Sequence, residues 1–298
     1  MRKFIQKGLF YLIGILTVAW VLARLGYFVI GNSSFYKPSY VASGLDNDRF
    51  DMIIAGSSRG LSALSAGQIQ NETGKKVLNL CMTDTALPTH FLMIQHFFES
   101  GNHADVVVLS LDLADMESSE VKIGDADFKF LPFSGEKYVQ DFYEVYDQSE
   151  LGSLKNSGLV PFMAFSEYNS QLIYPSLRGL INPDFTYLFD KNGDYSYPDY
   201  LARESTGELE DIELDLSNPI LEQIQEYVEA EGSRLVVYIA PYLSLRIDPG
   251  EKVGLNLINH SGLLELPRFF ADEVHLVNSG KKGATSAFLE ALDGVLSE

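Results

Sequence analysis

Cysteine is almost absent from this chain. Cys81 is the single cysteine among 298 residues, which excludes a disulfide within the chain and a cysteine-based zinc motif. It lies in an apolar stretch, where a cysteine usually serves as a small buried hydrophobic residue. Because exported proteins can also lack disulfides, the cysteine count leaves the compartment open.

Basic residues are also scarce. The chain has 22 Lys and Arg against 41 Asp and Glu, and its formal net charge is −19. Nucleic acids are bound through basic side chains that neutralise phosphates, so this deficit excludes nucleic acid as a partner. Anionic lipid headgroups would be repelled as well. Any membrane attachment must therefore come from the insertion of an apolar segment.

Motifs for common cofactors are missing too. The sequence contains no phosphate-binding loop, no dinucleotide fingerprint, no clustered metal ligands and no internal repeat. We therefore predict no cofactor and no metal. The chemistry has to be sought among serine, histidine and carboxylate side chains.

The N-terminus carries a long apolar run. Three basic residues within the first seven positions precede an uncharged run over 8–23, and Arg24 interrupts it before apolar residues resume over 25–30. About 20 apolar residues span a bilayer, and an arginine near a helix end can reach the interface. The basic flank predicts a cytoplasmic N-terminus. A signal peptide cleaved near Ala23 is the alternative.

These features predict three parts of the chain. Residues 1–30 form a cytoplasmic stub and a transmembrane anchor, and residues 31–48, which are small and polar, form a stalk. Residues 49–298 form a domain outside the cytoplasmic membrane. The protein would thus be a single-pass protein of the cytoplasmic membrane, with its domain in the periplasm or outside the cell.

The first motif of the domain is a strand followed by a tight turn. An apolar run over 50–55 predicts a buried strand, Gly56-Ser57-Ser58-Arg59-Gly60 predicts a turn, and a helix is expected over 61–72. The carboxyl edge of an open α/β sheet is where active sites lie. A serine in this turn is therefore a candidate site residue, although an ordinary strand-to-helix connection is the simpler interpretation.

Strands and helices alternate in two parts of the chain. Further strands are expected at 76–80, 105–111 and 234–240, and helices at 88–98, 219–231 and 279–296. Continuous apolar strands that alternate with helices indicate an α/β fold with a mostly parallel sheet covered on both faces. Between them, about 115–215 has no such rhythm and is predicted to be an insertion. Its aromatic residues serve packing or stack on sugar rings.

A second motif precedes the last helix. Of five histidines, only His275 has an acidic residue, Asp272, three positions before it, a spacing of about one helical turn. The carboxylate can orient the imidazole, and the imidazole can then take a proton from a serine hydroxyl. Such pairs are also common as inert surface pairs.

Together these motifs resemble a known superfamily. Gly56-Ser57-Ser58 after the first strand, with Asp272 to Leu276 before the last helix, is similar to the SGNH (GDSL-type) hydrolases. The N-terminal anchor, the long insertion and the closing Asp-x-x-His-Leu-x-x-x-Gly resemble its membrane-anchored branch. That branch includes proteins that work beside membrane-bound O-acyltransferases in alginate acetylation and in D-alanylation of teichoic acids. The resemblance covers about 48–115 and 216–296.

The resemblance implies both a fold and site residues. It implies a three-layer α/β/α sandwich of flavodoxin-like type, with Ser58 as nucleophile, His275 as base and Asp272 as its orienting carboxylate. Asp84 stands where the family has a glycine whose backbone N–H contacts the oxyanion. The asparagine of the family's third block has no counterpart in 110–115.

Other candidates surround this triad. Ser57 is the alternative nucleophile, and Gly56, Ser57, Arg59, Asp84 and Tyr242 are candidates for binding the oxyanion or the substrate. Arg59 would contact an acidic sugar or an acyl carboxyl, or else form a surface ion pair. Tyr242 follows the strand at 234–240 and would line the pocket.

The resemblance implies an esterase or transferase of O-acyl groups, acetyl above all, that acts on a cell-surface polysaccharide. The expected partners are the polysaccharide or an acyl donor, a membrane-bound O-acyltransferase, and the membrane itself. The alternative is a catalytically inactive protein of the same fold that binds glycan or docks onto such a transferase. A purely structural envelope protein is the third interpretation.

Overall fold

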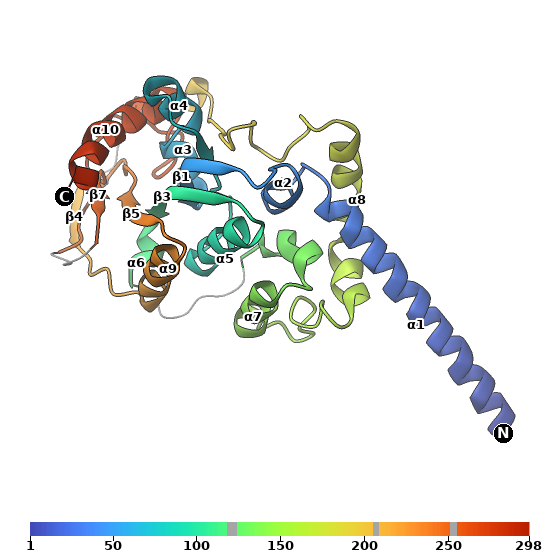
Figure 1. Cartoon of the computed structure of the whole chain (residues 1–298). Helices are drawn as coiled ribbons and strands as arrows, with labels where there is room; N and C mark the ends of the chain where they lie inside the picture. Colours follow the sequence, from blue (N-terminus) through green and yellow to red (C-terminus); the bar gives the residue numbers. More distant parts are fainter. Residues whose placement is uncertain (118–123, 205–208, 251–254, 298) are drawn as a thin grey trace. The chain divides into compact units, whose positions relative to one another are not determined.

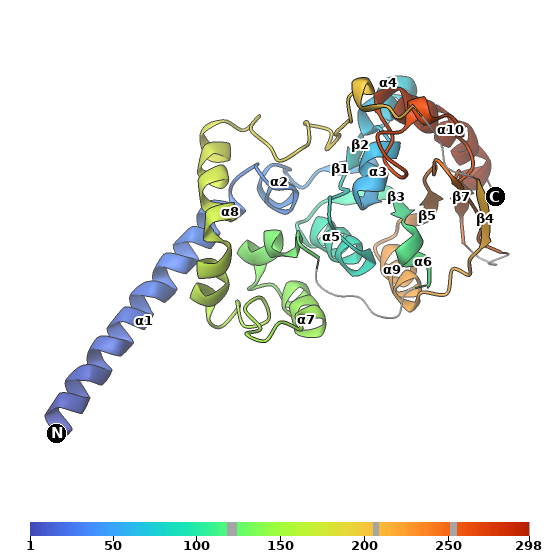
Figure 2. The same ribbon diagram turned by 180° about the vertical axis from the view of Figure 1, so that it is seen from behind.

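The computed structural model describes residues 1–117, 124–204, 209–250 and 255–297. They divide into two compact units (Figures 1 and 2). The first unit comprises 1–44 and 128–187, and the second comprises 45–127 and 188–298. The predicted insertion is therefore shared: 128–187 joins the N-terminal helix in the first unit, and the rest belongs to the second unit.

The second unit is built on a parallel sheet. Its strands lie in the order β2-β1-β3-β5-β7, and every neighbouring pair is parallel. The bounds are β1 Arg49–Gly56, β2 Val77–Asn79, β3 His103–Leu111, β5 Arg234–Ile239 and β7 Leu257–Asn259. The α/β class with a parallel central sheet, predicted from the sequence, is confirmed.

Helices cover both faces of this sheet. One set packs on one face and on each other, and α5 and α9 pack on the opposite face (Figures 1 and 2). The first set is α3 Ser58–Ala63, α4 Ala66–Thr73 and α10 Asn278–Ser297. The second set is α5 Leu87–Glu99 and α9 Pro219–Ala230.

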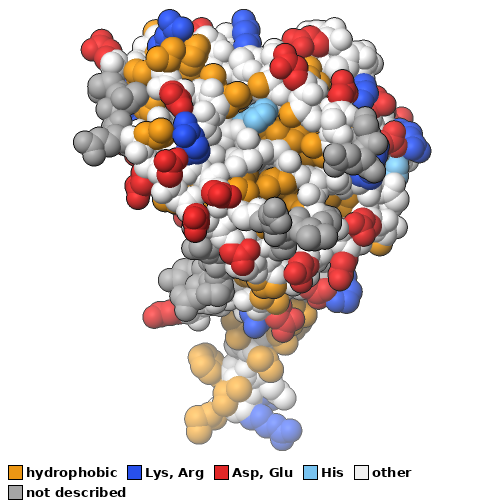
Figure 3. Space-filling view, turned by 90° about the vertical axis from the view of Figure 1, so that its left-hand side faces the viewer, with side chains coloured by type: hydrophobic (Ala, Val, Ile, Leu, Met, Phe, Trp, Pro, Cys, Tyr) orange, Lys and Arg blue, Asp and Glu red, His pale blue; other side chains and the backbone are white. Residues whose placement is uncertain are grey.

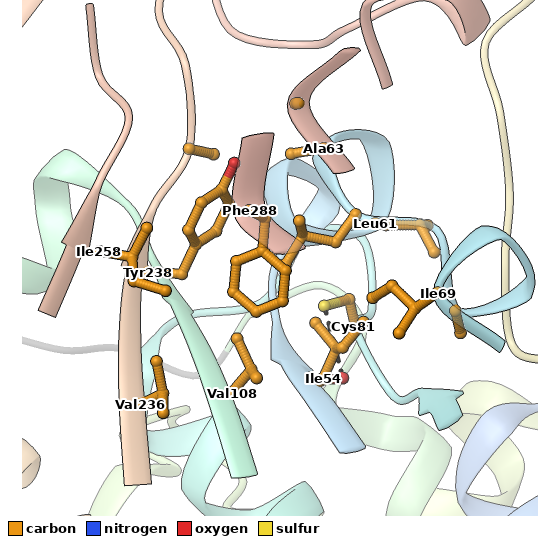
Figure 4. Close-up of a cluster of buried hydrophobic side chains, with 14 of the residues drawn as sticks. Ile54, Leu61, Ala63, Ile69, Cys81, Val108, Val236, Tyr238, Ile258 and Phe288 are labelled. Atoms are coloured by element: carbon orange, nitrogen blue, oxygen red, sulfur yellow. Dashed lines mark hydrogen bonds between the residues drawn. The ribbon is translucent and has the colours of Figure 1, made fainter. Parts of the chain in front are cut away.

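A hydrophobic cluster joins the sheet to the first set of helices. Figure 4 shows Ile54, Val108 and Val236 of the strands pointing toward Phe288 of α10, and all four side chains are fully buried. Each such side chain contributes about 1.5–3 kcal/mol through burial. Cys81 is buried in the same cluster, as predicted from the apolar stretch around it. Its thiol lies 3.7 Å from the Ile54 carbonyl oxygen.

The predicted helix over 61–72 is wrong as a single element. The chain forms two helices, because Leu64 is extended and Ser65 begins a new helix by accepting a hydrogen bond from the Gln68 N–H. The Asp194 carboxylate accepts from the Ala66 and Gly67 N–H groups at 3.0 and 2.9 Å. That contact comes from a residue more than a hundred positions away, so local periodicity does not reveal the break.

Three short strands escape sequence prediction. β7 is the edge strand of the main sheet, and β4 (Glu210–Glu213) pairs with β6 (Leu245–Asp248) in a separate parallel sheet. Each of them has three or four residues. Apolar alternation over so short a run is too weak to stand out from a loop.

The first unit consists of helices. Its helices are α1 Arg2–Gly31, α2 Lys37–Ser43, α7 Lys137–Tyr146 and α8 Pro161–Ile181. α1 is long and apolar enough to cross a membrane. The segment predicted as a stalk contains α2, in which Pro38 and Val41 are buried. Aromatic side chains of the predicted insertion pack inside this unit, for example Phe128 against Tyr168 with ring centroids 4.9 Å apart.

The surface is strongly acidic. Figure 3 shows one face of the molecule, on which acidic side chains are widely spread while apolar side chains cover α1 at the bottom of the view. This distribution agrees with the net charge of −19.

Candidate active site

The carboxyl ends of three neighbouring strands meet at one edge of the sheet. Gly56 at the end of β1 is in register with Ser110 of β3, and Leu111 of β3 is in register with Ile239 of β5. The residues that follow each strand are thereby brought together. The strand order reverses between β1 and β3, which is the place where open α/β sheets bind ligands.

Ser58, His275 and Asp272 form a continuous hydrogen-bonded relay at this edge. Ser58, the first residue of α3, has its Oγ 2.8 Å from Nε2 of His275. Nδ1 of His275 lies 2.7 Å from Oδ2 of Asp272. Both distances are those of good hydrogen bonds. The three residues predicted from the sequence are therefore brought together.

Asp272 shapes the loop that presents His275. Its Oδ1 accepts hydrogen bonds from the N–H groups of Val274 and His275, which leaves Oδ2 for the imidazole. The Ala271 N–H donates to the His275 carbonyl, and Phe270 forms an isolated antiparallel β-bridge with Leu276. The segment is therefore a closed loop and not the expected helical turn. The Asp272 carboxylate holds the backbone of this loop in place through its two hydrogen bonds.

The hydrogen bonds assign the proton positions. An ionised Asp272 accepts only, so Nδ1 of His275 carries the proton and Nε2 is free to accept from the Ser58 hydroxyl. Burial alone would raise the pKa of Asp272, but hydrogen bonds from His275 and from the Val274 N–H outweigh it and hold the pKa below its usual value. Asp272 thus stays ionised across the neutral range.

Tyr197 is a site residue that sequence reasoning missed. Its ring lies 5.4 Å from the His275 ring, and its backbone carbonyl accepts from the N–H of Asn278 at the start of α10. Burial, Tyr195 and the carboxylates of Asp272 and Asp84 together raise its pKa. It lies in the predicted insertion, where no motif singles out one tyrosine among many.

A cavity of about 800 Å³ is lined in part by Tyr195, whose ring centroid lies 5.3 Å from that of Tyr197. Ser58, Asp272 and His275 are not among its lining residues. Asn71 and Gln68 contribute amide groups to it. The lining also includes the charged residues Glu72, Asp190, Asp194, Lys281 and Lys282, so it suits a polar ligand.

Ser57 points its hydroxyl elsewhere. It is buried, its Oγ donates to Oδ2 of Asp112 at 2.5 Å, and it accepts from the Arg59 N–H. Among the described residues, the serine bonded to His275 is Ser58. The alternative nucleophile is therefore engaged as the cap of α3 and as a partner of Asp112.

Arg59 and Tyr242 lie inside the protein instead of in contact with solvent. Arg59 is 4% exposed and donates to the carbonyls of Ala240 and Pro241 at 2.7 and 3.0 Å. Its guanidinium lies 3.4 Å from the centroid of the buried Tyr242 ring and 3.6 Å from Oδ1 of Asp112. The predicted roles in substrate contact, surface pairing and pocket lining are replaced by a clamp that ties the β1 turn to the ends of β3 and β5.

Gly56 and Asp84 have unusual backbone conformations. Gly56 has φ +150°, and a side chain there would meet the Ser110 carbonyl oxygen at 2.7 Å, so it is needed for close packing. Asp84 has φ 59°, in the left-handed region that favours glycine, and its side chain is exposed. Gly56 therefore has a packing role, while Asp84 occupies a bend beside the site.

A buried ionisable cluster lies beneath the relay. Asp115 accepts hydrogen bonds from the N–H groups of Leu87 and Asp112, and its Oδ2 lies 3.8 Å from Nδ1 of His90. Burial raises the pKa of Asp115 to about 6 and lowers that of His90 to about 4, and it also raises the pKa of Asp112. Sequence reasoning did not find this cluster.

This cluster predicts opposing effects of pH on stability. Between its ordinary pKa of 6.5 and about 4, His90 is protonated in the unfolded chain only, so acidification weakens folding. Between about 6 and 3.8, Asp115 is protonated in the folded chain first, so acidification strengthens folding. We expect Asp115→Asn to remove the second effect. The free energy of unfolding of the Asp115→Asn variant should fall relative to that of the unsubstituted chain as the pH drops from 6 to 4. The fall should be up to about 1.4 kcal/mol per pH unit.

Urea titrations followed by circular dichroism at pH 7, 6, 5 and 4 measure this slope. His90→Gln is the matched control, and its relative stability should change in the opposite direction. Equal slopes for both variants and the unsubstituted chain would contradict the assignment.

The described residues contain no group of three or more His, Cys, Asp or Glu side chains placed to hold a metal ion. No protein-family model matches the chain, and no curated protein sequence matches it. The function therefore has to be inferred from the residues of the site.

Proposed function

We propose that this chain is a serine esterase or O-acyltransferase of the SGNH type, which removes or transfers an O-acyl group, acetyl above all, on a cell-surface polysaccharide. The observation that carries this proposal is the relay from Ser58 Oγ to His275 Nε2 at 2.8 Å and from His275 Nδ1 to Asp272 Oδ2 at 2.7 Å. A serine, an imidazole and a carboxylate in this geometry constitute the machinery of nucleophilic acyl transfer.

The proposed reaction has two halves. Ser58 Oγ attacks the acyl carbonyl carbon while its proton passes to Nε2 of His275, and the ionised Asp272 stabilises the imidazolium. The ester C–O bond breaks, the leaving alcohol takes the proton from His275, and an acyl-serine remains. His275 then deprotonates water or a sugar hydroxyl, which attacks the acyl-serine and restores Ser58.

The developing oxyanion needs hydrogen-bond donors. Ser58 is the first residue of α3, and helical geometry provides no acceptor for the N–H groups of the first turn. Its N–H is the first donor in this proposal, and each such donor is worth about 10²–10³ in rate. Asp84, which the resemblance aligns with the family's glycine, has a left-handed backbone conformation of the kind that glycine adopts readily, which supports the alignment.

The topology supports the SGNH relationship. Numbered within the main sheet alone, the strand order β2-β1-β3-β5-β7 becomes 2-1-3-4-5. This is the flavodoxin-like order, in which ligands bind between the first and third strands. Ser58 follows β1 and Asp112 follows β3, so the candidate site lies at that position.

The N-terminal helix supports a location at the membrane. α1 has 30 residues and is long and apolar enough to cross a membrane, and 30 residues extend about 45 Å as a helix. The basic residues at positions 2, 3 and 7 favour a cytoplasmic N-terminus. The second unit would then work outside the cytoplasmic membrane, where cell-surface polysaccharides are modified. The polar cavity beside Tyr197 is the proposed place for the sugar.

Covalent labelling tests the nucleophile. We expect a fluorophosphonate probe to modify the full-length protein, and peptide mapping by mass spectrometry to place the adduct on Ser58. His275→Gln should abolish labelling because the serine loses its base. An adduct on Ser57, or labelling that persists in His275→Gln, would contradict the proposed mechanism.

One observation favours a second candidate, a non-catalytic partner of a membrane-bound O-acyltransferase. The residue after β3 is Asp112, whose carboxylate is engaged by Ser57 and Arg59, whereas the family places an asparagine donor in its third block. A folded protein that resists labelling, and that co-purifies with such a transferase equally well after loss of Ser58 and His275, would favour this candidate.

A further inference from the structure

We propose that the first unit rests on the bilayer through an apolar collar around the C-terminal part of α1. The collar comprises Leu25 and Phe28 of α1 and Leu151 and Leu159 of the segment between α7 and α8. We expect the collar to contact the phospholipids of the membrane that α1 enters. The inference thus rests on the proposal that α1 spans a membrane, and it is independent of the acyl-transfer chemistry.

Helix geometry sets the height of the collar. The uncharged run over 8–23 covers about 24 Å along the axis, most of the roughly 30 Å thickness of the hydrocarbon core, and Lys7 and Arg24 flank it. Arg24 is the first charged residue after the uncharged run over 8–23, so it lies at the boundary with the headgroups. Its guanidinium lies 5.2 Å from the centroid of the Trp20 ring, and tryptophan is enriched at this boundary.

Contacts hold the segment before α8 at the same height. Arg24 donates to the Gly158 carbonyl at 2.5 Å, and the Tyr27 hydroxyl donates to the Pro161 carbonyl at 3.0 Å. Phe165 packs against Gly26, and its ring lies 5.9 Å from that of Tyr27. Residues 158–165 are therefore fastened to 24–27 of α1.

Large apolar side chains are exposed at this height. Leu159, next to Gly158, is 80% exposed, and Phe28, one turn beyond Arg24, is 69% exposed. Leu25 and Leu151 are 57% and 72% exposed. Backbone hydrogen bonds from the Asn156 N–H to the Gly152 carbonyl and from the Val160 N–H to the Asn156 carbonyl order the segment between Leu151 and Leu159.

The collar continues the apolar surface of α1 instead of forming a separate patch. Exposed apolar side chains run along α1 from Phe4 to Leu22 and continue at Leu25 and Phe28. Arg24 is only partly exposed, and its guanidinium donates to the carbonyl of Gly158, the residue before Leu159. With a net charge of −19 the protein gains nothing from anionic headgroups. The contact is hydrophobic, and zwitterionic lipid suffices for it.

Site-specific fluorescence tests the collar in the full-length chain. Cys81 is fully buried, so single cysteines at Leu159 and Leu151 can be labelled with NBD, and the unsubstituted chain serves as the labelling control. The protein is reconstituted into phosphatidylcholine vesicles that contain lipid spin-labelled near the headgroup. We expect a blue shift at both positions and at least threefold stronger quenching at Leu159 than at the control position Ile181.

Ile181 is a matched control. It is 87% exposed and apolar and lies in the same unit, but at the opposite end of α8 from Pro161. A Cβ on nearby Gly179 would meet Ser33 and Phe35, which follow the end of α1. Twenty residues of helix separate Ile181 from Pro161 by about 30 Å.

Leu16 lies in the middle of the apolar run and is 43% exposed. A labelled cysteine at this position tests whether α1 spans the membrane, independently of whether the collar contacts lipid. Quenching at Leu16 by lipid spin-labelled deep in the chain, without quenching at Leu159, would overturn the collar while the spanning helix stands. This outcome would assign the exposed leucines to a protein partner that pure lipid lacks. Equal quenching at Ile181 and Leu159 would overturn the collar too. No quenching at Leu16 would overturn both the spanning helix and the collar.

Discussion

Replacing Ser58 with alanine is expected to lower the turnover of 4-nitrophenyl acetate by about 10³- to 10⁶-fold, as removal of a catalytic serine does in triad enzymes. The expectation follows from the hydrogen bond between Ser58 Oγ and His275 Nε2, because the proposed mechanism uses this oxygen as the nucleophile. Without it, any residual rate comes from binding and from oxyanion donors alone. Initial rates of the purified full-length protein measure the effect.

The relay predicts strong non-additivity. His275→Gln should cost about as much as Ser58→Ala, and the double variant should be no slower than either, because each substitution already removes the activated nucleophile. Asp272→Asn should cost about 10²-fold, less than the roughly 10⁴-fold loss at a buried triad aspartate. The reason is that the Asp272 side chain is 52% exposed, so water replaces part of its effect.

Ser62→Ala provides the matched control. Ser62 lies one turn further along α3, is buried, and donates its hydroxyl to the Arg59 carbonyl instead of contacting His275. Its activity should stay within a fewfold of the unsubstituted chain. Full activity in Ser58→Ala, or a double variant far slower than both single ones, would contradict the proposed triad.

Replacing Arg59 with methionine is expected to lower the free energy of unfolding by about 3 kcal/mol, the low end of the range for removing one partner of a buried ion pair, because the Asp112 side chain is 24% exposed. Arg59 is 4% exposed and contacts Asp112, Tyr242 and two backbone carbonyls. Its loss leaves the Asp112 carboxylate, which already has a raised pKa through burial, without its cation. Urea unfolding followed by circular dichroism measures the change.

A second substitution distinguishes the charge effect from lost packing. Asp112→Asn in the Arg59→Met background should recover part of the stability, because an amide is less costly to bury than an unpaired carboxylate. Arg49→Met is the surface control: Arg49 pairs with Asp105 at 2.6 Å, but their side chains are 70% and 49% exposed. Such a pair is worth at most about 1 kcal/mol. Equal losses for Arg59→Met and Arg49→Met would contradict the clamp.

Sequence patterns predicted correctly those features that depend on interactions between residues close together in the chain. The parallel strands show as unbroken apolar runs, because both faces of each are covered, and Asn218, Pro219 and Gly74 mark helix ends through capping and backbone conformation. The Asp272–His275 pair is also local, since the two residues share one loop. The same reasoning failed for α3 and α4, because the break depends on a carboxylate from Asp194.

The sequence by itself therefore determined the long apolar N-terminal helix, the alternation of strands and helices, and the pairing of Asp272 with His275. Only the tertiary structure decided which serine meets the histidine, since Ser58 and His275 are 217 positions apart and are joined through the sheet. It also decided that Arg59 is a buried clamp and that Tyr197 stands beside the imidazole. The physical reason is that burial and charge pairing between distant segments depend on the register of the strands. That register cannot be inferred from the residues adjacent in the sequence.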